Sequence, residues 1–155
     1  MKLSESVSLV GFVAIIAAST VVVRSCSSEP SISPAAFDKT LEMMRGDMRT
    51  ATATGGVPLS SDDNQKTQIN RISISTSIRA DTWTGMVSME YVHVLLRRGW
   101  TILRQSSEGT VLCKGGAQAT VWSAHSDSPG TPVTGFLSMA FSPATMMECS
   151  PRESR

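Results

Sequence analysis

The sequence contains 155 residues, of which 41% are hydrophobic and 17% are charged, and its formal net charge at pH 7 is +1. This length accommodates one domain of ordinary size, and this composition is typical of a globular protein rather than a disordered chain. The longest run of basic residues is Arg97 and Arg98. Because a nucleic-acid-binding protein needs a strongly basic surface, we expect no nucleic-acid partner.

The first element is an uninterrupted apolar run over residues 7–23, with the sequence VSLVGFVAIIAASTVVV. As a helix rising about 1.5 Å per residue it spans about 26 Å, close to the hydrocarbon thickness of a bilayer. The run has no polar side that could face water, which disfavours a helix inside a globular core. We therefore expect residues 1–25 to be a signal or membrane-anchor segment with a hydrophobic helix, attached to the membrane through residues 7–23.

Three fates are open for this N-terminal segment: a cleaved secretory signal, a lipoprotein signal, or a retained anchor. Cys26 follows the apolar run, and the small residues before it resemble a bacterial lipobox, although Arg24 departs from that pattern. Cys26 is therefore a candidate for lipidation, with residues 26–33 as a polar tether. Charge on the two sides of the run hardly differs, so charge alone does not orient the segment.

The number of cysteines favours a location of the folded part outside the cytoplasm. If Cys26 is consumed at the membrane, Cys113 and Cys149 remain as a pair in the folded part. A disulfide between them would close a loop of about 35 residues and stabilise the domain by roughly 3–4 kcal/mol. The alternative is two buried unpaired thiols, since free cysteine is among the most buried residue types.

The folded part begins with a predicted helix. Ser33 and Pro34 suit the N-cap and first helical position, and Phe37, Leu41 and Met44 then recur at helical spacing. Beyond Arg49 no periodicity persists, so residues 49–67 are predicted to be a flexible loop.

The next two elements are a strand and a helix. Over residues 69–79, isoleucine and threonine alternate with serine and arginine, which predicts a strand with one buried face. A helix is expected to start near Asp81 or Thr82, with an apolar stripe that includes Met86 and Tyr91. Its predicted end has Gly99 in a left-handed cap and Trp100 packed back against the helix.

The remaining chain reads as strands. Residues 101–105 and 110–114 predict a hairpin, and residues 117–123 and 133–141 add two further strands. The predicted fold class is α+β: after the N-terminal hydrophobic helix, an antiparallel sheet of about four or five strands carries one or two amphipathic helices on one face. The domain is expected to span residues 34–149, with a disordered tail at residues 150–155.

The sequence contains no pattern that indicates a catalytic, cofactor or metal site, and we expect none. Its only histidines, His93 and His125, are far apart, and the three cysteines lack the close spacing of zinc motifs. His125 and Asp127 lie in one Ser- and Asp-rich turn, and they would be the only candidate pair for a small envelope hydrolase.

The sequence therefore favours a non-enzymatic, membrane-tethered module on the extracytoplasmic side of a bacterial cell envelope that binds another envelope protein. The uncovered sheet face and the loop at residues 49–67 are its expected contact surfaces. Two alternatives are open, the hydrolase that uses His125 and Asp127 and a small-ligand-binding domain. The latter requires an apolar cavity between a helix and the sheet.

Overall fold

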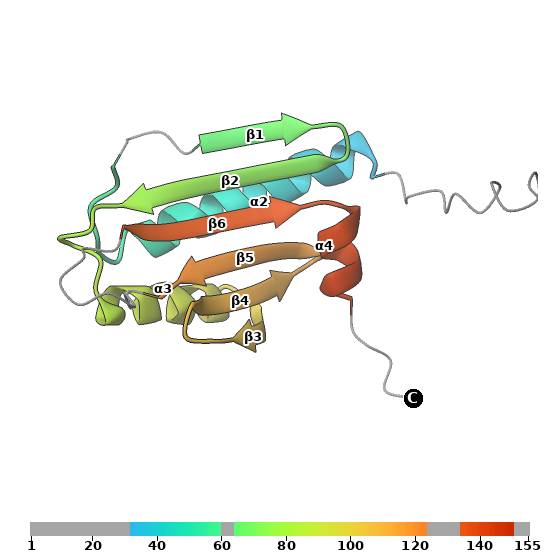
Figure 1. Ribbon diagram of the computed structural model, residues 1–155. Coiled ribbons are helices and arrows are strands. Elements are labelled where there is room, and N and C mark those ends of the chain that lie inside the picture. The colour runs from blue at the N-terminus through green and yellow to red at the C-terminus, as the bar shows by residue number, and fades with distance from the viewer. Residues whose placement is uncertain (1–31, 60–63, 124–133, 151–155) are drawn as a thin grey trace, which may run out of the picture. The chain divides into compact units, whose positions relative to one another are not determined.

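The computed structural model describes residues 32–59, 64–123 and 134–150, which form one six-stranded antiparallel sheet and three helices (Figure 1). The strands lie in the order β1-β2-β6-β5-β4-β3. Their bounds are β1 Asn64–Gln68, β2 Arg71–Ile78, β3 Thr101–Gln105, β4 Gly109–Lys114, β5 Ala117–Trp122 and β6 Gly135–Phe141. The helices are α2 Pro34–Thr52, α3 Gly85–Arg97 and α4 Pro143–Glu148. The α+β class and the antiparallel sheet are confirmed.

The sheet has one strand more than expected, because β1 lies in the segment that we predicted to be a loop. All five residues of β1 are polar and exposed. The strand therefore forms through its antiparallel backbone pairing with β2 rather than through burial of apolar side chains. Helix α2 also continues to Thr52, so the connection between α2 and β1 is shorter than residues 49–67 at both ends.

Helix α2 begins as the sequence indicates. The Ser33 hydroxyl accepts a hydrogen bond from the backbone N–H of Ala36, and Pro34 occupies the first turn. Met44, Met48 and Ala51 lie on the buried side of the helix. Together with the side chains of β2 and β6 they form one half of the hydrophobic core.

Helix α3 has Thr84 as its N-cap, a few residues later than expected. The side chain of Thr84 accepts a hydrogen bond from the backbone N–H of Val87. The end of α3 is the predicted Schellman motif. Gly99 has φ +87°, the N–H of Trp100 donates to the carbonyl of Leu95, and the N–H of Gly99 donates to that of Leu96. This turn places the buried Trp100 directly before β3.

Helices α2 and α3 pack on the same face of the sheet (Figure 1). Paired residues form a buried row across four strands on that face: Ile74, Met139, Ala119 and Leu112. The row beside it points to the opposite face, which we call the open face, and consists mainly of small polar side chains: Ser75, Ser138, Thr120 and Val111. The predicted alternation of β2 is thus confirmed, with Ile72, Ile74 and Ile78 on the helix side.

A short C-terminal helix, α4, was not expected. Its N-cap Ser142 and Thr145 exchange hydrogen bonds in a capping box, and Pro143 occupies the first turn. Residue Cys149, directly after α4, forms the predicted disulfide with Cys113 of β4. The bond therefore fastens the end of α4 to the sheet.

No helix within the described ranges is long and apolar enough to cross a membrane. Residues 7–23, Cys26 and, apart from Ser150, the predicted tail at residues 150–155 lie outside the described residues, so the N-terminal hydrophobic helix and the disordered tail stay predictions.

Gly135 lies so close to Trp83 that no side chain fits in the space between them. It pairs with Ile78 at the start of β6, and a Cβ atom there would lie 2.2 Å from Cδ2 of the buried Trp83. Because Trp83 would have to move, Gly135→Ala should lower the free energy of unfolding by about 1–3 kcal/mol.

Urea denaturation of matched variants measures this effect. The control is Gly85→Ala at the first position of α3, where an added Cβ meets nothing within 4 Å. We expect its stability to stay within about 0.5 kcal/mol of the parent. Equal unfolding midpoints for the two variants would contradict the close packing of Trp83 over Gly135.

Candidate functional site

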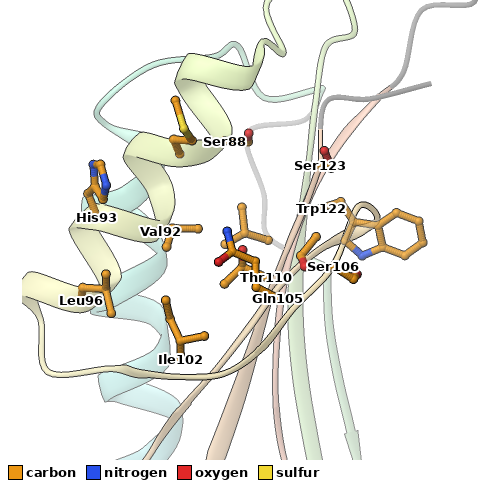
Figure 2. A pocket seen from close by; sticks show the side chains of 13 residues that line it. Ser88, Val92, His93, Leu96, Ile102, Gln105, Ser106, Thr110, Trp122 and Ser123 are labelled. Atoms are coloured by element: carbon orange, nitrogen blue, oxygen red, sulfur yellow. Dashed lines mark hydrogen bonds between the residues drawn. The ribbon is translucent and has the colours of Figure 1, made fainter. Parts of the chain in front are cut away.

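A groove lies between helix α3 and the β3–β4 hairpin (Figure 2). It arises because α3 packs against β5 near the middle of the sheet, whereas all five residues of the end strand β3 are exposed. The groove has a volume of about 300 Å³, and Thr110 and Val121 of the neighbouring strands also line it. We call this hollow the α3–β3 groove.

The α3–β3 groove has both polar and apolar lining residues, and the apolar ones gather on α3 and β3. Met89, Val92 and Leu96 follow one another at helical spacing on α3, and Ile102 faces them from β3. Met89 is 59% exposed and Ile102 is 46% exposed. Large apolar side chains that line one concave surface in this way are characteristic of interaction sites, whereas single exposed ones are ordinary.

Polar side chains also line the α3–β3 groove, among them His93 and Ser106. His93 lies on the outer side of α3 in Figure 2, with Nδ1 3.7 Å from Oε2 of Glu90. Glu90 also accepts from Arg97 at 2.8 Å, and this hydrogen bond is the main cause that lowers the pKa of Glu90. The Ser106 hydroxyl accepts from the backbone N–H of Glu108 within its own turn. These contacts give no nucleophile paired with a base.

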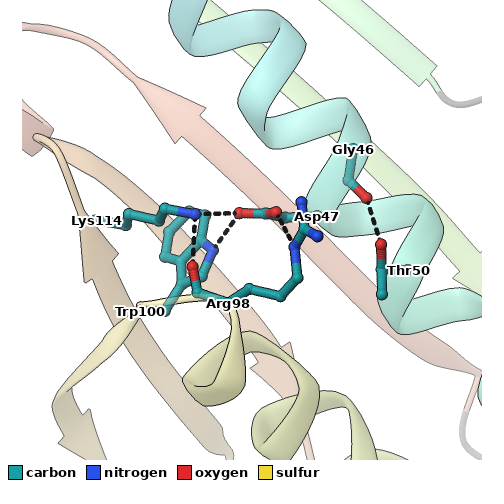
Figure 3. A network of polar contacts seen from close by, with 6 residues as sticks. All are labelled: Gly46, Asp47, Thr50, Arg98, Trp100 and Lys114. Carbon is teal, nitrogen blue, oxygen red and sulfur yellow. Dashed lines mark hydrogen bonds and ion pairs between the residues drawn. The ribbon is translucent and has the colours of Figure 1, made fainter.

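A second polar cluster surrounds one buried carboxylate and is structural (Figure 3). The carboxylate of Asp47, on α2, is fully buried. It accepts hydrogen bonds from Nε of Arg98, from Nε1 of Trp100 at 2.7 Å, and from Nζ of Lys114 at 2.8 Å. Lys114 also donates to the backbone carbonyl of Arg98 at 2.6 Å. The cluster therefore joins α2 to the end of α3 and to β4.

The protonation of Asp47 fits this structural role. Burial alone would raise the pKa of its carboxyl group, but the hydrogen bonds from Lys114, Trp100 and Arg98 together outweigh burial and lower it. The carboxylate is thus ionised at neutral pH, and three donors already occupy it. A group held in this way is not free to act as a general base or to bind a ligand.

The open face of the sheet, which we expected to be a contact surface, is less distinctive. Small side chains cover most of it, including Ser73, Ser75 and Ser138. Its aromatic feature is Trp122, whose ring meets that of Phe136 edge to face at 6.0 Å and points away from α3 in Figure 2. The exposed apolar surface is thus concentrated at the α3–β3 end of the sheet rather than across the open face.

The residues singled out in the sequence have different outcomes. Cys113 and Cys149 are brought together in the disulfide. His125, Asp127 and Cys26 lie outside the described residues, so the hydrolase and lipidation hypotheses stay predictions. Within the described ranges, no three His, Cys, Asp or Glu side chains gather as metal ligands would.

Sequence reasoning did not find the α3–β3 groove. The predicted apolar stripe of α3 is confirmed at Tyr91, Val94 and Leu95, which are buried, but it is wrong at Met86, which is 78% exposed. The sequence did contain a signal for the groove, because α3 has more large apolar residues than one buried stripe can hold.

No protein-family model, curated protein or solved structure matches this chain.

Proposed function

We propose that this protein is a non-enzymatic protein-binding module that works on the extracytoplasmic side of a cell envelope and binds its partner in the α3–β3 groove. The observation that carries the proposal is the row of exposed apolar side chains at this groove, beside β3, whose second edge pairs with no other described strand. Removing Met89, Leu96 and Ile102 from water would stabilise a complex, and the edge strand offers backbone hydrogen bonds as well.

The disulfide supports the proposed compartment. Stable disulfides form in oxidising environments such as the periplasm and the cell exterior, and they are rare in the cytosol. Cys113 and Cys149 form such a bond between β4 and the end of α4. In this proposal the apolar run at residues 7–23 directs the chain to the membrane, and the folded part meets another envelope protein.

A small-ligand-binding domain is the second candidate, because the α3–β3 groove lies between a helix and the sheet. Its volume of about 300 Å³ is at the lower end of small-molecule sites. However, such sites bury most of their ligand, and the edge strand on one side of this groove leaves it open. This geometry suits a chain segment that enters and leaves the groove better than an enclosed small molecule.

The proposed function predicts that charge in the groove abolishes capture of one defined partner. Tagged full-length chain is purified from the membranes of its source cells, and each co-purifying protein is tagged in turn to test reciprocal capture. Met89→Glu should weaken this capture at least about tenfold, because a carboxylate would be buried against the partner.

Met147→Glu is the matched control, since Met147 is 68% exposed on α4 and does not line the groove. It should capture the partner as the parent does. Circular dichroism checks that both variants are folded. If the Met89→Glu variant and the partner still capture each other as strongly as the parent does, the groove is not the binding surface.

A further inference from the structure

We infer that the partner contributes an extended segment that pairs with β3 as a seventh strand, with apolar side chains in the α3–β3 groove and a carboxylate beside Arg104. This inference rests on the proposed function and specifies the chemistry of the partner. Three features of the described residues carry it: the backbone of β3, the alternation of its side chains and the charge of Arg104.

The backbone of β3 favours a partner segment in an extended conformation. β3 pairs with β4 on one side, and the order of strands ends with β3, so no other described strand lies along its second side. The outward N–H and carbonyl groups of an edge strand are satisfied in a water-excluding complex by another strand, because a helix keeps its own backbone groups paired internally.

The side chains of β3 set the pattern of the added strand. Ile102 pairs with the buried Leu112 and therefore points to the helix side, whereas Arg104 pairs with Val111 and points to the open face. Since side chains alternate along an added strand too, one set would enter the groove against Ile102 and Met89. The other set would lie next to Arg104. An alternation of apolar and acidic residues fits both sides.

The pairing irregularity at Leu103 limits how long this added strand can be. The register between β3 and β4 shifts between Ile102 and Arg104. Such irregularities at a sheet edge disfavour indiscriminate sheet extension. Regular pairing can therefore cover only a short segment, and the side chains in the groove and at Arg104 supply the selectivity.

The charge of Arg104 favours a carboxylate on the partner, and Glu108, which lines the same hollow as Arg104, makes no ion pair with it. Arg97 is paired with Glu90, and Arg98 and Lys114 are paired with Asp47. Arg104 makes no ion pair with any described residue. It is thus the cation near the groove that remains available for an acidic side chain.

The same charge disfavours a second copy of this chain as the partner. If β3 paired antiparallel with its own copy, the Arg104 side chains of both copies would lie on the same face of the joined sheet, where their like charges would repel one another. An acidic segment of a different protein removes this repulsion and pairs the charge.

Two end-blocked eight-residue peptides test the inference, one alternating valine with glutamate and the other valine with lysine. Each is titrated into the full-length chain, with fluorescence anisotropy for affinity and amide hydrogen exchange for location. The glutamate peptide should bind at least about tenfold more tightly than the lysine peptide, and its binding should slow exchange in β3. Arg104→Glu should reverse the preference between the peptides.

Two controls separate strand pairing from simple adhesion. N-methylation of alternate amides in the glutamate peptide should weaken binding at least about tenfold, because it removes donors on one side of the strand. Lys66→Glu on the opposite edge strand, β1, should change nothing. Equal affinity for the methylated peptide, protection of β1 instead of β3, or no binding of either peptide at millimolar concentration would each overturn the inference.

Sedimentation of the full-length chain tests whether a second copy of this chain pairs with β3 instead. A dimer that Ile102→Lys dissociates would assign the β3 edge to a second copy and overturn the inference.

The experiments distinguish a failure of the strand pairing from a failure of the proposed function. If the peptides do not bind but Met89→Glu still abolishes partner capture, the groove binds a partner in another way. If Met89→Glu has no effect on capture, the proposed function itself fails.

Discussion

Replacing Asp47 with alanine is expected to lower the free energy of unfolding by about 2–4 kcal/mol, because it leaves the buried indole N–H of Trp100 without an acceptor and removes the counter-ion of two partly exposed cations. The carboxylate of Asp47 is fully buried and accepts hydrogen bonds from Arg98, Trp100 and Lys114. Removing it leaves these donors without their acceptor, and the positive charges of Arg98 and Lys114 lose their counter-ion. Urea denaturation at neutral pH measures the change.

Two variants control this result. Asp38→Ala removes a carboxylate from an exposed position of the same helix and should change stability by less than about 0.5 kcal/mol. Asp47→Asn keeps the shape of the side chain but turns an amide N–H₂ towards the donors, so it should also destabilise the domain. Unchanged stability of both Asp47 variants would mean that the cluster does not hold α2 against β4.

Lowering the pH should reduce the difference in free energy of unfolding between the parent and Asp47→Ala. The hydrogen bonds lower the pKa of Asp47 in the folded state below its ordinary value of 3.8. The stabilisation is therefore complete above the pKa of the unfolded chain and is lost as pH falls through the lower folded pKa. Denaturation curves at neutral pH and below about pH 4 test this sign. A gap that widens on acidification would contradict the lowered pKa.

Reducing the Cys113–Cys149 disulfide should destabilise the domain by about 4 kcal/mol. The two cysteines are 36 residues apart in the sequence, and opening this loop gives the unfolded chain more conformational entropy. The measurement is urea denaturation with and without dithiothreitol, in a Cys26→Ser background so that only this pair reacts. The double variant Cys113→Ala and Cys149→Ala is the control.

In that control the unfolding midpoint should already be low, and the reductant should not shift it further. If the parent and the double variant unfold at the same urea concentration under oxidising conditions, the disulfide does not stabilise the folded state. The support that it gives to an oxidising compartment would then be weakened as well.

Local signals in the sequence were enough to place most elements. Ser33 and Pro34 mark the start of α2, and the alternation over residues 71–78 identifies both β2 and its buried face. Gly99 and Trp100 form the predicted end of α3. These features were predictable because each depends on residues that are neighbours in the chain.

The features that sequence reasoning missed depend on distant residues. The donors to Asp47 follow it by 51, 53 and 67 positions, so nothing near Asp47 indicates that a charged side chain is buried there. Strand β1 has no apolar residue and exists because β2 lies beside it. The groove depends on how α3 is rotated about its axis, which leaves Met86 in water and buries Ser88.

The position of β6 has a consequence for how the chain folds. The last of the described strands, β6, lies between β2 and β5, and among the described strands it alone links β1 and β2 to the other three. Early and late parts of the chain thus cannot join into one sheet until residues near the C-terminus have been synthesised and inserted. Folding should be slow for a domain of this size, because its central pairings close long loops. A chain truncated before Gly135 should yield two unconnected fragments of sheet whose exposed edges promote aggregation.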